Sequence, residues 1–170
     1  MMWFTADLHL GDTNILHDMD RPFDSVEEMN RKVIDAINEC VAADDRLYIL
    51  GDFTYRLPMA EAVRLRERIE CKNATLIRGN HDGDWEDSDA PQIWEDVRDY
   101  LEIAPGYAKG HRLVMSPYPH AQLERQGTWR HYAAWGISTA GVTAPTHATA
   151  IASARSCAMT LALMPTTTDP

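Results

Sequence analysis

Aspartate, histidine and asparagine residues directly follow three separate apolar segments of the chain. The three groups are Asp7-Leu8-His9, Gly51-Asp52 and Gly79-Asn80-His81-Asp82. Carboxylate, imidazole and amide oxygen ligands suit Mn²⁺, Fe or Zn²⁺, and the groups lack the thiolates that structural zinc sites use. Two such ions about 3.5 to 4 Å apart can activate a water and hold the oxygens of an in-line displacement at phosphorus. The residue types therefore indicate metal-assisted chemistry at phosphate.

Each group alone is a weak signal, because an Asp-x-His or Gly-Asp sequence is also typical of a turn with a solvated carboxylate. The signal gains weight from the segments that precede the groups. Residues 2–6, 47–50 and 74–78 are short, apolar and β-prone, and each ends in a polar turn. In open α/β sheets, ligands collect beyond the carboxyl ends of the strands. We therefore expect all three groups to lie at one edge of a sheet.

Helical segments separate the predicted strands. Ser25 begins a capping-box pattern, and apolar residues follow at helical intervals over residues 26–42. Pro58 suits the first turn of a second helix. A further short helix near residues 92–97 and a strand near 112–115 complete the pattern. The alternation of strands and helices predicts an α/β fold with a parallel sheet.

Composition restricts the class of protein. The chain has 170 residues, 45% of them hydrophobic, which is enough for one buried core without disulfides. No apolar run approaches the roughly 18 residues that cross a bilayer, and the N-terminus lacks the features of a secretory signal. Cys40, Cys71 and Cys157 lack metal-ligand spacing and are typical of reduced thiols. We therefore expect a cytoplasmic protein that does not associate with a membrane.

The net charge of −10 argues against an extended nucleic-acid-binding surface, because phosphate backbones are bound by clustered lysine and arginine. Metal ions would supply the positive field that such an acidic protein lacks. The expected partner is therefore a small phosphorylated substrate, with a nucleotide as one candidate. The sequence leaves the oligomeric state open.

Four motifs of the chain resemble those of calcineurin-like metallophosphoesterases, in particular the small bacterial and phage type. They are WFTADLHLG at residues 3–11, RPF at 21–23, LGDF at 50–53 and IRGNHD at 77–82. The resemblance extends from about Met2 to Pro119. It implies a four-layer αββα sandwich, incomplete here at the C-terminus. It also implies hydrolysis of phosphodiester or phosphomonoester bonds by a water that bridges two metal ions.

The resemblance assigns a ligand to each strand end. Asp7 and His9 would hold one divalent ion, Asp52 would bridge both ions, and Asn80 would hold the second. Two ions are expected in the family, with Mn, Fe and Zn as the candidates.

The same resemblance makes His81 the acid that assists the leaving group, with Asp82 orienting it. Independently of the resemblance, a histidine beside a carboxylate is a reasonable proton donor near neutral pH. Arg56, four residues after Asp52, has two interpretations, which are contact with a substrate phosphate and a surface ion pair.

The later ligands of the family are missing. The family places a ligand histidine in the turn after the fourth strand, where this chain has Pro117, and a proline ring cannot bind metal. No Gly-His-x-His sequence follows. His120, His131 and His147 are either substitute ligands or ordinary exposed histidines. The sequence therefore allows an alternative function: a catalytically impaired, non-enzymatic relative that retains only part of the dinuclear site and holds fewer than two ions.

The chain divides into a predicted metallophosphoesterase core, residues 1–122, and an atypical tail, residues 123–170. From residue 133 onward only Arg155 and Asp169 are charged, alanine and threonine dominate, and no sustained periodicity predicts a helix or a strand. Small side chains bury little area against a backbone entropy cost of about 1 to 2 kcal/mol per ordered residue. We therefore expect the tail to be poorly ordered.

We hypothesise that a shift of reading frame produced this tail. Residues 135–140 can be encoded so that another frame gives Gly-His-Leu-His-Gly, the missing motif, and residues 123–134 and 156–170 also permit family-like peptides in other frames. The coding DNA beyond Pro119 tests the hypothesis directly. Alternative frames that do not encode these peptides would exclude it.

Overall fold

The computed structural model of the chain describes residues 1–83, 85, 92–104, 111–117, 130–135, 149–151 and 160–163. For residues 111 and 112, and for the strands beyond residue 117, only the backbone is described.

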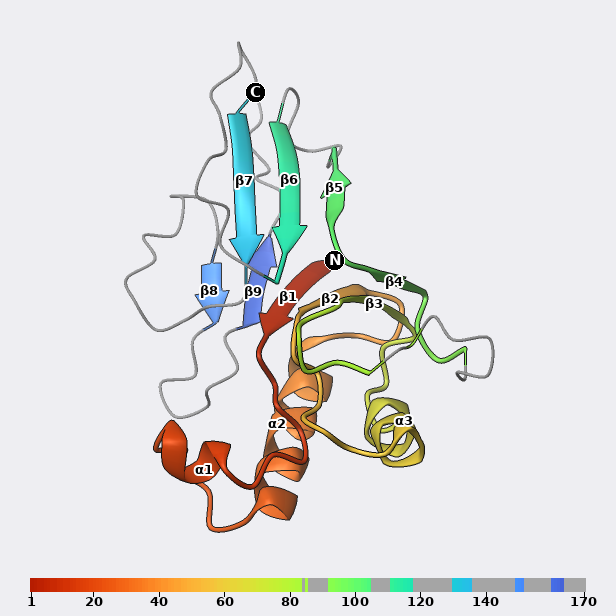
Figure 1. The fold of residues 1–170 in the computed structure, drawn as a ribbon. Coiled ribbons are helices and arrows are strands. Elements are labelled where there is room, and N and C mark those ends of the chain that lie inside the picture. Colours follow the sequence, from red (N-terminus) through yellow and green to blue (C-terminus); the bar gives the residue numbers. More distant parts are fainter. Residues whose placement is uncertain are drawn as a thin grey trace.

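The strands that precede the three groups are neighbours in one six-stranded sheet (Figure 1). Strands β1 (Met2–Ala6), β2 (Arg46–Leu50), β3 (Asn73–Ile77) and β4 (Asp96–Arg98) are parallel. Strands β9 (Thr160–Leu163) and β8 (Thr149–Ile151) extend the sheet beyond β1 by antiparallel pairing, and the strand order is β4-β3-β2-β1-β9-β8.

The register of the central strands aligns their carboxyl ends. Ala6 is paired with Leu50, and Leu50 with Ile77, so the three strands end at the same level. The residues that follow them therefore enter the same edge of the sheet. This confirms the parallel arrangement that the sequence predicts.

Helices cover one face of this sheet. They are α1 (Ile15–Asp18), α2 (Val26–Cys40) and α3 (Met59–Glu67). The Oγ atom of Ser25 accepts a hydrogen bond of 3.1 Å from the backbone N–H of Glu28, which begins α2 as the sequence predicts. The apolar stripe of α2 packs on the sheet, and each fully buried aliphatic side chain contributes about 1.5 to 3 kcal/mol.

A second sheet covers the opposite face, as Figure 1 shows above β1 and β2. It consists of β5 (Leu101–Ile103), β6 (His111–Ser116) and β7 (Arg130–Trp135), in that order. Leu113 and Met115 of β6 pack in one buried cluster with Phe4, Tyr48 and Ile77 of the first sheet. The α/β class is confirmed, and the described residues supply three of the four layers of an αββα sandwich. Within these residues, no helix is long and apolar enough to cross a membrane.

The short helix predicted near residues 92–97 is wrong. Strand β4 lies there and pairs with β3. Trp94 precedes it, and its ring makes edge contacts with Phe53 at 5.0 Å and Trp85 at 5.7 Å between ring centroids. Parallel pairing and this aromatic cluster determine the structure of the segment, and neither has a local sequence signal.

The tail also differs from expectation, because β7, β8 and β9 lie within it although its sequence predicted no strand. Strand β7 pairs with β6, and β9 pairs with β1. Tertiary pairing thus supplies what the local pattern lacks. Most of the tail lies outside the described residues, so its poor order stays a prediction.

Candidate metal centre

The loops at the strand ends have an unusual backbone. Asp7, His9 and Asp52 have φ angles of 50°, 51° and 47°, and Gly51 has a φ angle of 80°. Residues other than glycine rarely adopt this left-handed conformation, and those that do concentrate at functional sites. Each of the three residues predicted to hold metal through a carboxylate or imidazole is therefore in a conformation that its surroundings must enforce.

Backbone hydrogen bonds enforce it by continuing the pairing of β1 with β2 past the edge of the sheet. The N–H of Asp7 donates to the carbonyl of Gly51 at 3.2 Å, and that of His9 donates to the carbonyl of Asp52 at 2.8 Å. The N–H of Leu10 donates to Phe53 at 3.0 Å. The two loops thus form one unit, which fixes the direction of the side chains.

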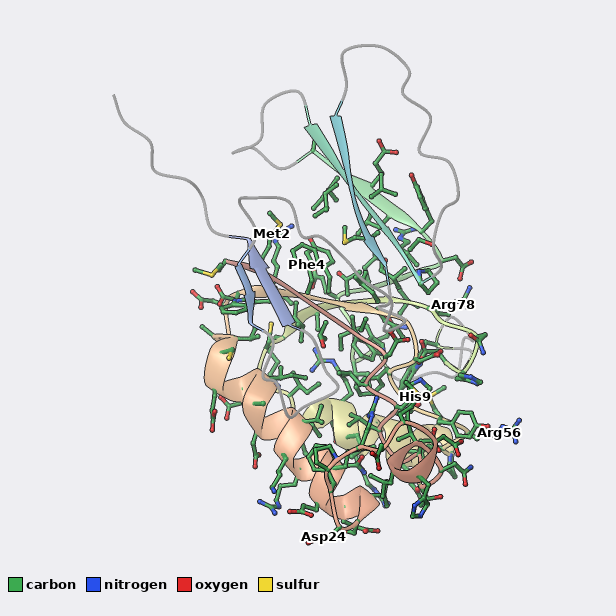
Figure 2. All side chains as sticks on the ribbon, turned by 90° about the vertical axis from the view of Figure 1, so that its left-hand side faces the viewer. Met2, Phe4, His9, Asp24, Arg56 and Arg78 are labelled. Carbon is green, nitrogen blue, oxygen red and sulfur yellow. The ribbon has the colours of Figure 1, made fainter. Side chains whose placement is uncertain are left out.

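The side chains of Asp7, His9 and Asp52 converge. One ligand atom from each lies within 4.8 Å of the others, which is a spacing that suits a shared cation. The Nε2 atom of His9 lies 3.5 Å from Oδ2 of Asp52, and Nδ1 lies 3.3 Å from Oδ2 of Asp12. A carboxylate behind a ligand histidine is a common outer-shell partner that orients the ring. Figure 2 shows His9 beyond the end of β1 that lies away from Met2.

The electrostatics of this cluster also suit a cation. Burial, and next the neighbouring charge of Asp52, raises the pKa of Asp7 to about 6. Burial lowers the pKa of His9, which keeps its imidazole neutral and able to bind metal. Two carboxylates that repel each other in a partly buried site are stabilised by a divalent ion between them. The donor set and its charge therefore fit the metal that the sequence predicts.

The loop after β3 contacts the cluster of Asp7, His9 and Asp52 through the backbone N–H and the ring of His81. The N–H of His81 donates to Oδ1 of Asp52 at 3.1 Å, and the rings of His81 and His9 have centroids 5.7 Å apart. The amide nitrogen of Asn80 lies 3.0 Å from Nε2 of His81. His81 therefore borders the cluster of Asp7, His9 and Asp52, and the exposed Asn80 side chain contacts the ring of His81.

The fold and this cluster can now be set beside known proteins. A model of the calcineurin-like phosphoesterases matches residues 2–139. The chain belongs to the calcineurin-like phosphoesterase family. The match passes beyond Pro119, where the resemblance recognised in the sequence ends. Members of this family are metal-dependent phosphoesterases, which are hydrolases that use divalent ions, and the group of Asp7, His9 and Asp52 is a candidate site for such an ion.

The chain is similar to proteins of a virus, an archaeon and a bacterium. The gene 66 protein of Mycobacterium phage L5 is 30% identical over 147 residues, which cover 75% of this chain and 70% of the phage protein. An uncharacterized protein of Methanocaldococcus jannaschii is 39% identical over 83 residues, 48% of this chain. This chain spans 46% of that relative, less than half of its length. A solved structure of a protein of unknown function from Aquifex aeolicus has a TM-score of 0.56 and 28% identity, covering 70% of this chain and 61% of that one.

Asp82 does not occupy the position that the family resemblance suggested. It was expected to orient His81, but its Oδ1 accepts a hydrogen bond from the N–H of Phe53 and its Oδ2 from that of Gly79, both at 2.8 Å. Burial raises its pKa to about 6, while these backbone hydrogen bonds act in the opposite direction. Among the described contacts, Asp82 thus joins the second and third strand-end loops. It acts on His81 only through the position of the backbone.

Pro117 lies where the missing histidine was expected. A Cβ atom at Gly51 would come within 3.0 Å of the Cβ atom of Pro117, so the proline packs directly beside the loop that carries Asp52. The chain therefore has an apolar ring at the edge of the candidate metal centre. His120 and His147 lie outside the described residues, and only the backbone of His131, in β7, is described.

Arg21 contributes to the candidate site, although the sequence analysis assigned no role to it beyond its place in a motif. Its buried guanidinium donates to the carbonyl of Leu8 at 2.8 Å and to that of Asp7 at 2.9 Å. It thereby holds the backbone that carries two of the candidate metal ligands, and its positive charge opposes the rise of the pKa of Asp7. The RPF motif at residues 21–23 was the signal available in the sequence.

Replacing Arg21 by alanine is expected to weaken Mn²⁺ binding about 10- to 100-fold, because groups that position metal ligands have effects of this size. The free energy of unfolding should fall by about 2 kcal/mol, since buried carbonyls lose a charged donor. Arg66 is the matched control, because its buried guanidinium also donates to carbonyls, those of Ile69 and Cys71, away from the metal centre. R66A should lose stability but keep its metal affinity, and equal affinity in both variants would contradict the role of Arg21.

Metal affinity should depend on pH through Asp7. Because its pKa is raised to about 6 in the metal-free protein, a proton competes with the ion as the pH falls through that value. The dissociation constant for Mn²⁺ should therefore rise about tenfold between pH 7 and pH 5, as measured by isothermal titration calorimetry. Burial lowers the pKa of His9, so its competition with the ion is moved toward lower pH. An affinity that is constant over this range would show that Asp7 is not a ligand.

Proposed function

We propose that this phosphoesterase hydrolyses phosphomonoester or phosphodiester bonds of a small phosphorylated molecule, with a nucleotide as the first candidate. The observation that supports this most directly is the convergence of Asp7, His9 and Asp52 within 4.8 Å at the edge of a parallel sheet. The net charge of −10 supports a small substrate over a nucleic-acid duplex. A cytoplasmic location and Mn²⁺ as the ion are parts of the same proposal.

The chemistry divides between the metal ions and the side chains. When bound, the divalent ions supply an activated water and positive charge for the phosphoryl oxygens. Asp7, His9 and Asp52 would hold the first ion, and Asp52 and Asn80 would face the second. Their loops are fixed by backbone pairing before the metal arrives, which limits the reorganisation that binding requires.

His81 would donate the proton to the leaving oxygen. Its backbone N–H is bound to Asp52, and its ring contacts Asn80, so it is positioned relative to two ligands at once. Histidine is the side chain that most often serves as a general acid in enzymes. His81 would then bind the oxygen of the leaving group on the side of the phosphorus away from the attacking water.

Pro117 favours a second candidate function, a catalytically impaired relative that binds one ion. Proline offers no ligand atom beside Gly51, so the second ion would rest on Asp52 and Asn80 among the described residues. Fewer ligands lower both the affinity and the geometric control of that ion. This alternative predicts metal binding without turnover.

Counting metal ions and measuring hydrolysis on the same full-length preparation distinguishes the two functions. We would titrate the metal-free protein with Mn²⁺ and assay bis(4-nitrophenyl) phosphate and 4-nitrophenyl phosphate. Two bound ions with turnover that stops on addition of a chelator would support the phosphoesterase. At most one bound ion without turnover of either ester would support the impaired relative.

A further inference from the structure

Tyr55 lies between the candidate catalytic residues and the surface. Its N–H donates to the carbonyl of Leu10 at 3.3 Å, and a bridge between Leu10 and Thr54 holds the same segment. The ring of Tyr55 meets the edge of His81 with 4.7 Å between ring centroids, and its centroid lies 6.2 Å from that of His9. The hydrogen-bonded loops that hold the metal ligands therefore also fix Tyr55 beside His81.

Arg56 continues this arrangement outward. Its guanidinium carbon lies 5.0 Å from the centroid of the Tyr55 ring, and Figure 2 shows its side chain reaching the edge of the molecule. Its φ angle of 51° places a bulky residue in the left-handed region, where few arginines are found. Such a conformation persists only where the surrounding structure enforces it. The direction of the Arg56 side chain is therefore set by the loop and by the ring beneath it.

Within the part of the chain that the structure describes, the guanidinium of Arg56 is left available to a ligand. Among the described residues it forms no ion pair and donates no hydrogen bond, and its contact is with the face of Tyr55. This excludes, for that part of the chain, the surface ion pair that the sequence left open. Stacking on an aromatic ring leaves the N–H donors of an arginine directed outward, where they can bind a carboxylate or a phosphate in a bidentate manner.

We propose that Tyr55 and Arg56 form a subsite for the leaving group of the substrate, and that this group carries its own negative charge. The inference rests on the proposed function, because it takes the metal centre as the place of the phosphoryl group. In the proposed function His81 lies at the leaving oxygen, the ring of Tyr55 contacts His81, and Arg56 stacks on the ring of Tyr55. A group released past His81 therefore meets the aromatic ring first and the cation second. The substrate class is a phosphate ester whose leaving group bears a carboxylate or a second phosphate.

A matched pair of esters tests the subsite. We would compare 2-nitrophenyl phosphate with 5-carboxy-2-nitrophenyl phosphate, which differ by one carboxylate on the leaving group, using the full chain with Mn²⁺. The measured quantity is the ratio of kcat/KM for the charged ester to that for the uncharged one, because intrinsic reactivity cancels when variants are compared. R56A should lower this ratio about tenfold relative to the wild type, the size expected for one charge-assisted contact. R56K should recover part of the loss.

Arg64, an exposed arginine of α3, provides the matched control. R64A should keep the ratio of the wild type, whereas an R56A ratio equal to that of the wild type would overturn the proposal. The source of the charge is resolved by repeating the comparison with an ester whose leaving group carries a phosphate. A larger loss in R56A with that ester would identify phosphate as the preferred group, and a larger loss with the carboxylate would identify carboxylate.

A binding measurement separates failure of the subsite from failure of the proposed function. In the metal-free chain, where no metal-dependent turnover occurs, NMR titration with each ester would follow the Nε–H signal of Arg56. The carboxylated ester should shift this signal and should bind about tenfold more tightly than the uncharged ester, a preference that R56A removes. If no ester is hydrolysed but this preference is found, the proposed function fails and the subsite stands. If turnover is found without the preference in either assay, the subsite fails.

Discussion

Asp52→Asn is expected to reduce metal-dependent hydrolysis about 10³-fold or more. Bound ions lower the activation barrier by several kcal/mol through charge stabilisation, and each loss of about 1.36 kcal/mol slows the reaction tenfold. Asp52 is the residue of the candidate site that contacts both His9 and His81. Its Oδ2 lies 3.5 Å from Nε2 of His9, and its Oδ1 accepts the N–H of His81. Asparagine keeps the size of the side chain and an acceptor for that N–H, but it removes the charge and one of the metal-binding oxygens.

The same variant should remain folded. The charge of Asp52 raises the pKa of Asp7, so its removal should lower that pKa and relieve a repulsion in the metal-free protein. The free energy of unfolding without metal should therefore equal or exceed that of the wild type, as measured by urea titration. Asp35→Asn, on the exposed face of α2, should change neither activity nor Mn²⁺ affinity. Retention of both properties by D52N would show that the cluster is not the metal centre.

The fold at this site could be predicted because its signals are local. The apolar run of residues 2–6 forms strand β1, which has the same bounds as predicted. The capping pattern at Ser25 begins α2 as expected. The convergence of Asp7, His9 and Asp52 followed from one non-local rule, that parallel strands end at the same edge. That rule needs no knowledge of loop conformation.

Features that depend on loop conformation could not be predicted. The left-handed backbone at His9 and Asp52 results from hydrogen bonds between two loops, and the RPF motif does not reveal that Arg21 binds carbonyls. The family resemblance assigned Asp82 to orient His81, whereas the turn directs its carboxylate to the amides of Phe53 and Gly79. The roles of these side chains are set by backbone geometry that the sequence does not encode locally.

Gly79 is the position where this geometry leaves no room for a side chain. A Cβ atom there would lie 2.6 Å from the backbone nitrogen of Asp52 and would also collide with the Asp52 carboxylate. Both contacts involve atoms that are held in place, so an added methyl group must displace the loop that carries the shared ligand. Overpacking of this kind costs about 3 kcal/mol of stability.

Gly79→Ala is therefore expected to lose about 100-fold in kcat, since a displacement of roughly 1 Å at a catalytic group can have an effect of that size. Its Mn²⁺ affinity should fall in parallel, because Asp52 and His81 move together through the hydrogen bond between them. Gly83→Ala is the matched control, since a Cβ atom there meets only the terminal methyl of Met59 at 3.6 Å, an ordinary contact. Calorimetric titration and unfolding of both variants would separate the two effects. The G79A protein could instead be destabilised and bind Mn²⁺ normally. That result would mean that the close packing of Gly79 against Asp52 stabilises the fold but does not contribute to metal binding.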